Sequence, residues 1–571
     1  MKLPRAEYAR QFGPTTGDLI RLGDTDLRVR VEADDVGYGD EPVWGYAKNW
    51  RSRQAQNDRA AKDSELDMLI AGVVIIDPFL GVRKTSIGIK DGRIAGIGRA
   101  GNPDVMTGTD LTIGPNTWPV NGYGLIATAG AVDSHVHLIT PRLVPVALSA
   151  GVTTLITAGF EEPPYVMDKT LRAFEFLPVN LGLQASARTD APGQLDRVLE
   201  AGACGLKIHE DWGAYPEIID ATLRFADQHD IAVCLHTDGL NEAGELPDTI
   251  DAIGGRSVHA YHVEGAGGGH IPDLIGIVAA PSVVCSSTTP TLPYGRAAAA
   301  EHLEMILLSH GGSPDVPHDV EIAAERVHPA SMAAEGPLHE LGAISIINSD
   351  SQGMGRIGET IRRTWQLAHA MKQWRQTGHG QDWPGTDPAS TDPASAADDD
   401  NARVLRYLAK YTAEPARVHG IEAHAGSLRP GRLADIVLWR PGYFGVRPEL
   451  VLKGGWFAWG PFGSGSATVE GAEPRRYGAH WAGQGTAAPE LSVTFVSAAA
   501  EAAGLGQRLG TRRRIVPVQG TRQVTRASLL ANTMVPPVEV DPADGTVSLG
   551  GRTLQASPVT EVPLSRRYLL G

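Results

Sequence analysis

Short apolar segments, each ended by a polar side chain and followed by a helical segment, recur through the middle of the chain. The clearest of these strand-like segments are ACGLKIH (203–209), IAVCLH (231–236), SVHAYH (257–262) and AISIINSD (343–350). After the first of them, Pro216 begins a predicted helix in which Ile219 and Leu223 share one face. Successive strand–helix units of this length favour a parallel sheet with crossover helices. Because polar residues stand at several strand ends, we predict a (β/α)8 TIM-like barrel rather than an open sheet.

Two β-rich regions flank these units. Residues 66–98 contain a short strand and a hairpin around Asp91-Gly92, and GRLADIVLW (431–439) and LVLKGGWFAWG (450–460) lie far downstream. Neither region is large enough to close a sandwich alone. We therefore predict a small composite β domain that the barrel interrupts. The predicted boundaries are residues 1–129 plus 421–475 for the β domain, 130–420 for the barrel, and 476–571 for a C-terminal α/β extension.

One segment has the composition of a solvated insertion. Residues 386–400, TDPASTDPASAADDD, contain a tandem pentapeptide and no apolar side chain larger than that of alanine. Such a segment cannot bury enough apolar surface to offset the entropy of ordering it. We predict that it is a disordered insertion without a functional role.

The charge balance restricts the partners. Lys and Arg number 51 and Asp and Glu number 66, which gives a net charge of −15. This acidic balance argues against nucleic acid or an anionic membrane surface as the main partner. No run approaches the roughly 18 consecutive apolar residues that a membrane span needs.

The cysteines point to a compartment. Cys204, Cys234 and Cys285 are too few for a disulfide framework, and their odd number suits a reducing environment. All three lie in or beside apolar strands, so we interpret them as structural. The start, MKLPRAEYARQFGPTTGD, shows no apolar signal core, and we expect a cytoplasmic protein.

The polar residues at the strand ends are those of a metal site. Ser134-His135-Val136-His137 follows an apolar run, and on a strand its two imidazoles point to the same side. Four later strand ends carry Lys207 with His209, then His236, His262 and Asp350. In a TIM barrel these ends meet at the face where active sites are built. We therefore predict a metal centre at this end of the barrel.

The ligand types suggest two metal ions. Four imidazoles and a carboxylate exceed what one tetrahedral ion needs, so we expect two ions about 3.5–4 Å apart. Burial beside cations favours the neutral amine of Lys207, and a neutral amine can add CO2 to become a bridging carbamate. Imidazole-rich sites suit zinc, nickel, copper or iron, and the residue types alone do not choose between them.

Long motifs resemble a known family. GLKIHEDWGAYP, AYHVEGAGGGHIPDLI, SDSQGMGRIGETIRRTWQLAHAMK and RLADIVLW closely resemble the alpha subunits of ureases, which are nickel-dependent amidohydrolases. The resemblance runs nearly end to end, from FGPTTGDLIRLGDTDL to EVPLSRRYLLG. It implies two nickel ions per subunit at an amidohydrolase (β/α)8 barrel. The implied ligands are His135, His137 and Asp350 for one ion, His236 and His262 for the other, and N6-carboxylated Lys207 as the bridge.

The resemblance also implies roles in catalysis. His209 donates a hydrogen bond to the carbonyl oxygen of urea. His310 is the general acid toward the departing ammonia, on a flap formed by roughly residues 300–326. Asp211 and Arg326 match the positions that orient and tune that histidine.

The sequence departs from the family pattern at three places. Ser309 stands where the family has a cysteine before the flap histidine, and Gly353 replaces an alanine near the substrate. The third departure is larger. The loop at 155–171, LITAGFEEPPYVMDKTL, is about ten residues shorter than the family's glycine-rich substrate loop, and it carries Glu161, Glu162 and Tyr165.

These observations leave three hypotheses about function. The leading one is a urease catalytic subunit that hydrolyses urea to ammonia and carbamate, with beta and gamma partner subunits in a trimeric assembly and accessory proteins that load nickel. The altered loop favours a second hypothesis, a related amidohydrolase that acts on a larger urea-like or amidine substrate. The third is a non-catalytic scaffold, against which the complete ligand set argues.

Overall fold

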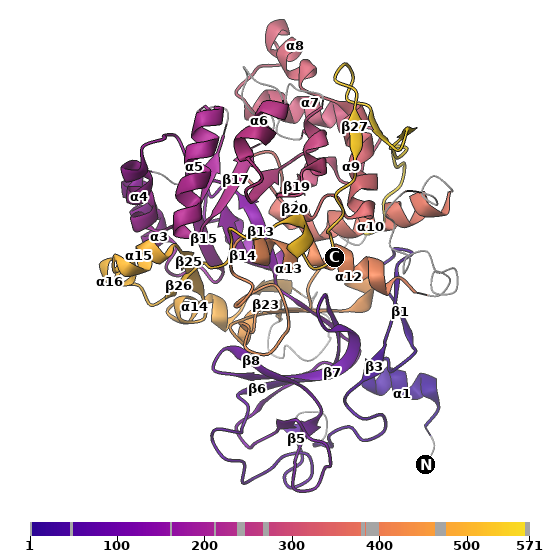
Figure 1. Cartoon of the computed structure of the whole chain (residues 1–571). Helices are drawn as coiled ribbons and strands as arrows, with labels where there is room; N and C mark the ends of the chain where they lie inside the picture. The colour runs from indigo at the N-terminus through magenta and orange to yellow at the C-terminus, as the bar shows by residue number, and fades with distance from the viewer. Residues whose placement is uncertain are drawn as a thin grey trace.

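The computed structural model describes residues 3–45, 49–159, 163–209, 213–236, 246–265, 273–377, 383, 399–462 and 476–565. A barrel wrapped by helices lies above a β-rich region in Figure 1. The chain passes from one to the other through Gly130, which alone separates strand β12 (Ile126–Ala129) from strand β13 (Ala131–Val136). A Cβ on Gly130 would lie 2.2 Å from the hydroxyl oxygen of Thr153, so this junction needs a glycine.

Eight parallel strands form the barrel within the described residues. They run in sequence order as β13 (Ala131–Val136), β14 (Val152–Thr157), β15 (Asn180–Ser186), β16 (Ala203–Ile208), β17 (Ala232–His236), β18 (Val258–Tyr261), β19 (Val283–Thr288) and β20 (Ile346–Asn348). Every residue of these strands is buried. Such near-continuous apolar strands are typical of a parallel sheet that is covered on both faces. The predicted (β/α)8 fold is confirmed.

Helices follow the strands of the barrel, and most of them pack around it. They are α2 (Leu143–Ala150), α3 (Pro164–Ala173), α4 (Pro192–Ala201), α5 (Pro216–His229), α6 (Leu246–Ile253), α7 (Ala298–Ser309), α8 (Pro317–Glu325), α9 (Pro329–Leu341), α10 (Thr360–Gln376), α12 (Asn401–Ala409) and α13 (Ala413–Val418). Several of them begin with proline, whose fixed φ suits the first helical position and whose missing N–H is not needed there. Helices α2 and α9 end at Gly151 and Gly342, both in the left-handed conformation.

The barrel closes through contacts between β13 and the residues after β20. Val136 forms an isolated parallel bridge with Ser351, and the backbone N–H of His137 donates to the carbonyl oxygen of Ser351 over 2.8 Å. The backbone N–H of Ser349 donates to Asp133 Oδ1 over 3.1 Å. These bonds bring His135 and Asp350 to the same seam.

A second sheet takes strands from both sides of the barrel in the sequence. Its order is β24 (Arg476–Ala479), β23 (Trp456–Phe462), β22 (Leu450–Lys453), β21 (Ile436–Trp439), β12, β6 (Met68–Asp77), β7 (Gly81–Lys90) and β3 (Ala33–Asp34), with β8 (Arg93–Gly98) on β7 and β11 (Trp118–Asn121) on β6. The antiparallel pair β12–β21 joins the two halves. The predicted hairpin is confirmed, since Lys90 pairs with Arg93 around Asp91 and Gly92, both at positive φ.

Smaller elements complete the chain. Before the barrel these are α1 (Arg5–Phe12), β1 (Leu19–Arg21), β2 (Arg28–Arg30), β4 (Trp44–Gly45), β5 (Asn49–Trp50), β9 (Ala100–Gly101) and β10 (Leu111–Thr112). After the second sheet come α14 (Ala487–Glu490), β25 (Val493–Val496), α15 (Ala498–Ala502), α16 (Leu505–Leu509), β26 (Arg514–Pro517), β27 (Val538–Val540), β28 (Val547–Leu549) and β29 (Arg552–Thr553). Strand β25 pairs in parallel with barrel strand β15 and with β26, so this part of the chain extends the barrel sheet.

Of the predicted insertion 386–400, residues 386–398 lie outside the described residues. Asp399 and Asp400 are described, and both are held in place. Asp399 forms an ion pair with Arg30, and Asp400 Oδ2 accepts the backbone N–H of Arg28. The N-terminal end of α12 is therefore tied to strand β2.

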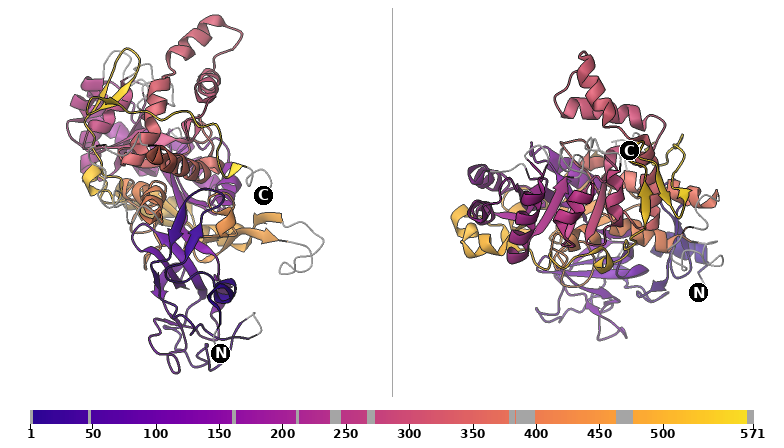
Figure 2. Two further views of the ribbon diagram at one scale, coloured as in Figure 1. Left: turned by 90° about the vertical axis from the view of Figure 1, so that its right-hand side faces the viewer. Right: turned by 45° about the horizontal axis from the view of Figure 1, so that its top comes forward.

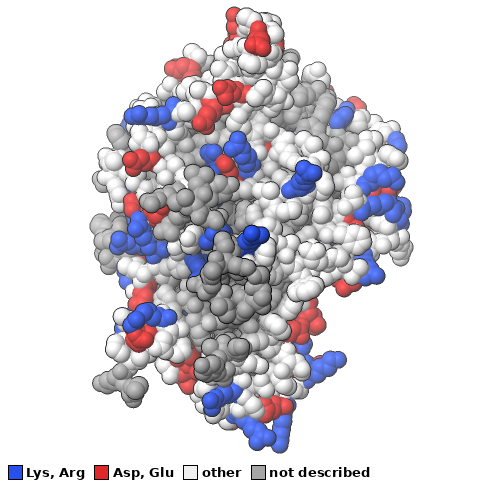
Figure 3. Space-filling view, turned by 180° about the vertical axis from the view of Figure 1, so that it is seen from behind, with Lys and Arg blue, Asp and Glu red and all other residues white. Residues whose placement is uncertain are grey.

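Two features of the outer surface bear on partners. Charged side chains of both signs are interspersed on the face shown in Figure 3, where neither sign forms a continuous patch. Among the described helices, none combines the length and the apolar character that crossing a membrane requires.

Candidate metal centre

Seven predicted site residues meet at the carboxyl ends of the barrel strands. His135 lies in β13, Lys207 in β16 and His236 at the end of β17, and the others follow the strands directly. The full set is His135, His137, Lys207, His209, His236, His262 and Asp350, and none of these residues is more than 7% exposed. Burying so many basic groups and a carboxylate together is costly unless they are paired or bind a metal.

Asp350 lies between two of the imidazoles. Its Oδ1 is 3.2 Å from His135 Nε2 and 3.0 Å from His137 Nε2. Atoms that bind one ion at about 2.0–2.2 Å lie about 3 Å from one another. The spacing of these three atoms therefore fits a single shared metal ion. Ligand atoms of His135, His262 and Asp350 also lie within 4.8 Å of one another.

Lys207 lies beside this group. Its Nζ is 3.4 Å from His135 Nε2 and 5.0 Å from the centre of the Tyr261 ring. The side chain is fully buried. Gly159 makes room for it, because a Cβ at that glycine would lie 2.9 Å from Lys207 Cβ.

The remaining imidazoles are packed against one another. The ring centres of His236 and His262 are 4.2 Å apart, those of His209 and His236 are 3.8 Å apart, and those of His135 and His262 are 5.3 Å apart. His236 and His262 thus form a second group of donors beside the first. The two groups together fit a centre of two ions.

Burial sets the protonation states of the cluster. It lowers the pKa of His135 well below the usual value, with the charge of Lys207 acting in the same direction. Burial also lowers the pKa values of His137 and His209. Burial raises the pKa of Asp350, but the hydrogen bond and charge of His137 outweigh it and leave that pKa below the usual value. Neutral imidazoles and an ionised carboxylate are the forms that bind metals.

The backbone at the cluster is held in unusual conformations. His262, Asp350 and Gln352 have positive φ values of 33°, 51° and 66°. Such conformations cost about 1–3 kcal/mol each in non-glycine residues and concentrate at functional sites. Gly353 leaves no space for a side chain, since a Cβ there would lie 2.5 Å from Asp350 Oδ1.

Two family profiles match this chain. The profile of the Amidohydrolase family matches residues 126–458, and that of the Urease alpha-subunit, N-terminal domain, matches residues 1–120. The urease subunit alpha of Natronomonas pharaonis is 44% identical over 100% of this chain and 99% of its own length. The chain belongs to the urease alpha-subunit family.

Further relatives have the same description. The urease subunit alpha of Haloquadratum walsbyi is 43% identical over 100% of both chains, and urease subunit alpha 1 of Streptomyces avermitilis is 44% identical over 99% of both.

Among solved structures, the dihydropyrimidinase of Brevibacillus agri matches with a TM-score of 0.47 and 13% identity, over 68% of this chain and 94% of that one.

The flap residues that the urease resemblance singles out lie apart from the cluster. Helices α7 and α8 project away from the barrel in both views of Figure 2. His310 follows α7 and is exposed, and its Nδ1 lies 2.9 Å from the carbonyl oxygen of Ile306. Ser309 donates its hydroxyl to the carbonyl oxygen of Met305 over 2.6 Å, and Arg326 follows α8. The structure therefore does not bring His310 into the buried cluster.

Part of the unusual loop lies outside the described residues. Glu161 and Glu162 of this loop are among the residues that the structure does not describe, and so is Asp211. Tyr165, in α3, is 71% exposed and packs under Lys169, whose Nζ is 5.1 Å from the centre of its ring. Tyr165 thus faces solvent.

Sequence reasoning missed the residues that support the cluster. The Tyr261 ring stacks on His135 with the ring centres 4.0 Å apart, and its hydroxyl donates to the carbonyl oxygen of Ser134 over 2.7 Å. Side chains alternate between the two faces of a strand, so Asp133, two residues before His135, lies on the same face of β13. The sequence alone could have pointed to this residue. No sequence signal pointed to its bond with Ser349, because that bond arises from barrel closure.

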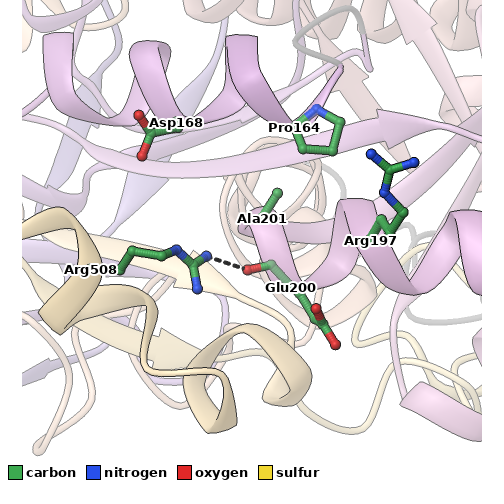
Figure 4. Close-up of a pocket in the computed structure, with 6 residues that line it drawn as sticks. All are labelled: Pro164, Asp168, Arg197, Glu200, Ala201 and Arg508. Atoms are coloured by element: carbon green, nitrogen blue, oxygen red, sulfur yellow. Dashed lines mark hydrogen bonds between the residues drawn. The ribbon is translucent and has the colours of Figure 1, made fainter.

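A hollow on the outside of the barrel is separate from the metal centre. It is lined by residues of α3, α4 and α16, namely Pro164, Asp168, Arg197, Glu200, Ala201 and Arg508, with a volume of about 280 Å³ (Figure 4). Two of its charged side chains are already engaged: Arg508 donates to the carbonyl oxygen of Glu200, and Asp168 accepts from Arg172. We assign no function to it.

Proposed function

We propose that this chain is the catalytic subunit of a urease, which hydrolyses urea to ammonia and carbamate at two nickel ions. The observation that carries the proposal is the convergence of four buried imidazoles, Lys207 and Asp350 at one end of the barrel. The full-length identity of 44% to a protein named urease subunit alpha supports it.

The donor set fits such a centre. His135, His137 and Asp350 would hold one ion and His236 and His262 the other, with N6-carboxylated Lys207 as a ligand that they would share. The distances of 3.0 and 3.2 Å from Asp350 Oδ1 to the two imidazole nitrogens support the first group. The position of Lys207 Nζ, 3.4 Å from His135 Nε2, supports the bridging role.

The residues around the centre orient the substrate. Bound divalent metal ions polarise a carbonyl oxygen and activate water as a nucleophile. His209 is neutral because burial and the nearby His236 lower its pKa, so it has one N–H to donate to the urea oxygen. Gly353 lies against Asp350 and His137 and has no side chain to displace them.

His310 supplies the proton for the departing ammonia. The C–N bond of urea breaks only when the leaving nitrogen is protonated, which needs an acid within hydrogen-bond reach. The arm formed by α7 and α8 closes over the barrel mouth, brings His310 to the substrate and excludes water. Asp211 and Arg326 orient His310 in that closed state.

The chain works within a larger cytoplasmic assembly. Urease beta and gamma subunits join it in an alpha–beta–gamma heterotrimer, and three of these associate. Nickel-loading accessory proteins supply the ions. The name "subunit alpha" of the relatives supports a multi-subunit complex.

The test uses the assembled enzyme. The chain is co-expressed with its beta and gamma subunits and the accessory proteins, metal per chain is counted by mass spectrometry, and ammonia release from urea is assayed. We expect two nickel ions per chain and ammonia release. Lys207→Ala should lose both, whereas Lys62→Ala, which changes an exposed lysine outside the barrel, should lose neither. A small carboxylate should partly restore activity to the Lys207 variant.

Each other outcome contradicts the proposal in a distinct way. Two nickel ions without ammonia release would favour a larger urea-like or amidine substrate. No bound metal under conditions that load a control urease would favour a scaffold. Full activity of Lys207→Ala would rule out the bridging role.

A further inference from the structure

A second group of metal-binding side chains lies within the fold, apart from the predicted centre. Cys234 lies in β17, two residues before His236. His259 lies in β18, three residues before His262. The two are register partners in the parallel pair β17–β18. His419, which follows α13, completes the group. The proposed nickel ligands do not include any of these three residues.

The three side chains have the spacing of metal ligands. Cys234 Sγ is 3.9 Å from His259 Nδ1, and His259 Nδ1 is 3.2 Å from His419 Nε2. All three ligand atoms lie within 4.8 Å of one another. A tetrahedral ion at about 2.0–2.1 Å from nitrogen and about 2.3 Å from sulfur places its nitrogens roughly 3.3 Å apart and nitrogen and sulfur roughly 3.6 Å apart. The measured distances are close to both values.

The surroundings favour a ligand over simple packing. Cys234, His259 and His419 are at most 2% exposed. Gln184, which contacts Cys234, donates its Nε2 to Tyr261 over 3.0 Å, while its buried Oε1 has no hydrogen-bond partner within the described part of the chain. A buried polar atom without a partner calls for an ion or water.

We propose that Cys234, His259 and His419 bind a third metal ion, separate from the two-metal centre and of the borderline-soft class to which Zn²⁺ belongs. One thiolate and two imidazoles are ligand types that suit such an ion. On binding, the sulfur–hydrogen bond of Cys234 is replaced by a sulfur–metal bond, and the proton passes to solvent. The ion ties β17 and β18 to the end of α13, inside the barrel that carries the catalytic residues. This site does not depend on the proposed urease activity.

Cobalt provides a specific probe, because Co²⁺ bound to a thiolate gives a sulfur-to-metal charge-transfer band in the near ultraviolet. The proposed two-metal centre contains no cysteine and cannot produce that band. The full chain is produced in medium with Co²⁺ as the added metal, and its spectrum is compared with those of four single variants. Metal per chain is counted for the same samples.

We expect the band in the unaltered chain and its complete loss in Cys234→Ala, with one metal fewer per chain. Cys204→Ala and Cys285→Ala, which change the other two buried cysteines, should keep the band. Lys207→Ala should also keep it, because the site stands apart from the two-metal centre. Circular dichroism is used to check that each variant is folded. If Cys234→Ala does not fold, Cys234→Ser provides a second variant.

A chain that binds cobalt without showing the band would overturn the proposal, since the thiol would then be buried only by packing. Persistence of the band in Cys234→Ala, or its loss in Cys204→Ala or Cys285→Ala, would also overturn it. An equal metal count in the unaltered chain and in folded Cys234→Ala would do the same.

Discussion

The backbone N–H of Ser349 donates to Asp133 Oδ1 over 3.1 Å, across the seam where the barrel closes. Asp133 is two residues before His135, and Ser349 is directly before Asp350, so this bond helps to set the spacing between two proposed ligands of the same ion. Both residues are buried. The position of the metal centre therefore depends on how β13 meets the residues after β20.

Replacing Asp133 tests this dependence. Asp133→Ala leaves the buried N–H of Ser349 without its acceptor, and we expect a loss of about 1–3 kcal/mol in the free energy of unfolding together with weaker metal binding. Asp133→Asn keeps an acceptor oxygen and should retain most of both. The measurements are thermal denaturation in the absence of urea and the number of metal ions bound per chain, made on both variants. Equal behaviour of the two variants would show that the hydrogen bond is not what holds the seam.

Gly353 takes the place of the family's alanine where space is tight. A Cβ there would lie 2.5 Å from Asp350 Oδ1 and 2.7 Å from His137 Cδ2. Gly353→Ala restores the family residue, and its methyl group should displace one of these side chains or the local backbone, at a cost of about 1–3 kcal/mol in stability. Gly193→Ala, in helix α4 where nothing lies within 4 Å of the added methyl, provides the control and should be neutral or slightly stabilising. If Gly353→Ala binds metal like the unaltered chain, the local backbone must shift to admit the methyl group.

His310 is expected to affect turnover but not metal content. His310→Gln removes the proposed acid, so kcat should fall by about 100-fold or more while both nickel ions stay bound. His318→Gln changes an exposed histidine on α8 of the same arm and should leave kcat unchanged. Steady-state kinetics and the number of nickel ions per chain distinguish the His310 variant from the His318 variant. Loss of nickel from His310→Gln would exclude the proposed role.

Glu340 is expected to make stability depend on pH. It is buried among Arg375, Arg403 and Arg406. Burial opposes its ionisation, but the charges of Arg403 and Arg406 outweigh this and lower its pKa from 4.5 to about 2. A carboxyl with a lowered folded-state pKa stabilises fully above its unfolded pKa, and this stabilisation, about 3 kcal/mol here, is lost as the pH falls from about 4.5 toward 2.

Comparison with Glu340→Gln isolates this effect. The difference in thermal stability between the unaltered chain and the variant should be constant above pH 5 and shrink as the pH falls below about 4.5. Arg512 pairs with the exposed Glu490 in the C-terminal region, so Glu490→Gln serves as the control and should show little pH-dependent difference. A difference for Glu340→Gln that does not change with pH would contradict the lowered pKa.

The sequence allowed prediction of the barrel and of which residues gather at its mouth, for a simple reason. Polar residues such as Lys207 and His236 interrupt buried apolar strands, and parallel strands bring such ends together. The hairpin at Asp91-Gly92 followed from local turn chemistry. These features depend on short stretches of chain.

Features that depend on tertiary contacts were not predictable. The stacking of Tyr261 on His135 and the bond between Asp133 and Ser349 join distant parts of the chain. Cys234 was interpreted as structural because it lies in an apolar strand, and nothing in the sequence placed His419 beside it. Likewise, the motif around His310 did not indicate that α7 and α8 stand away from the barrel (Figure 2).

The most direct test of the proposed centre is a crystal structure of the nickel-loaded assembly with anomalous diffraction data collected at the nickel edge. We expect two peaks about 3.5–4 Å apart. One should lie against His135, His137 and Asp350, the other against His236 and His262, with electron density for a carboxylated Lys207 between them. A single peak, or nickel bound away from these side chains, would contradict the proposed two-metal centre.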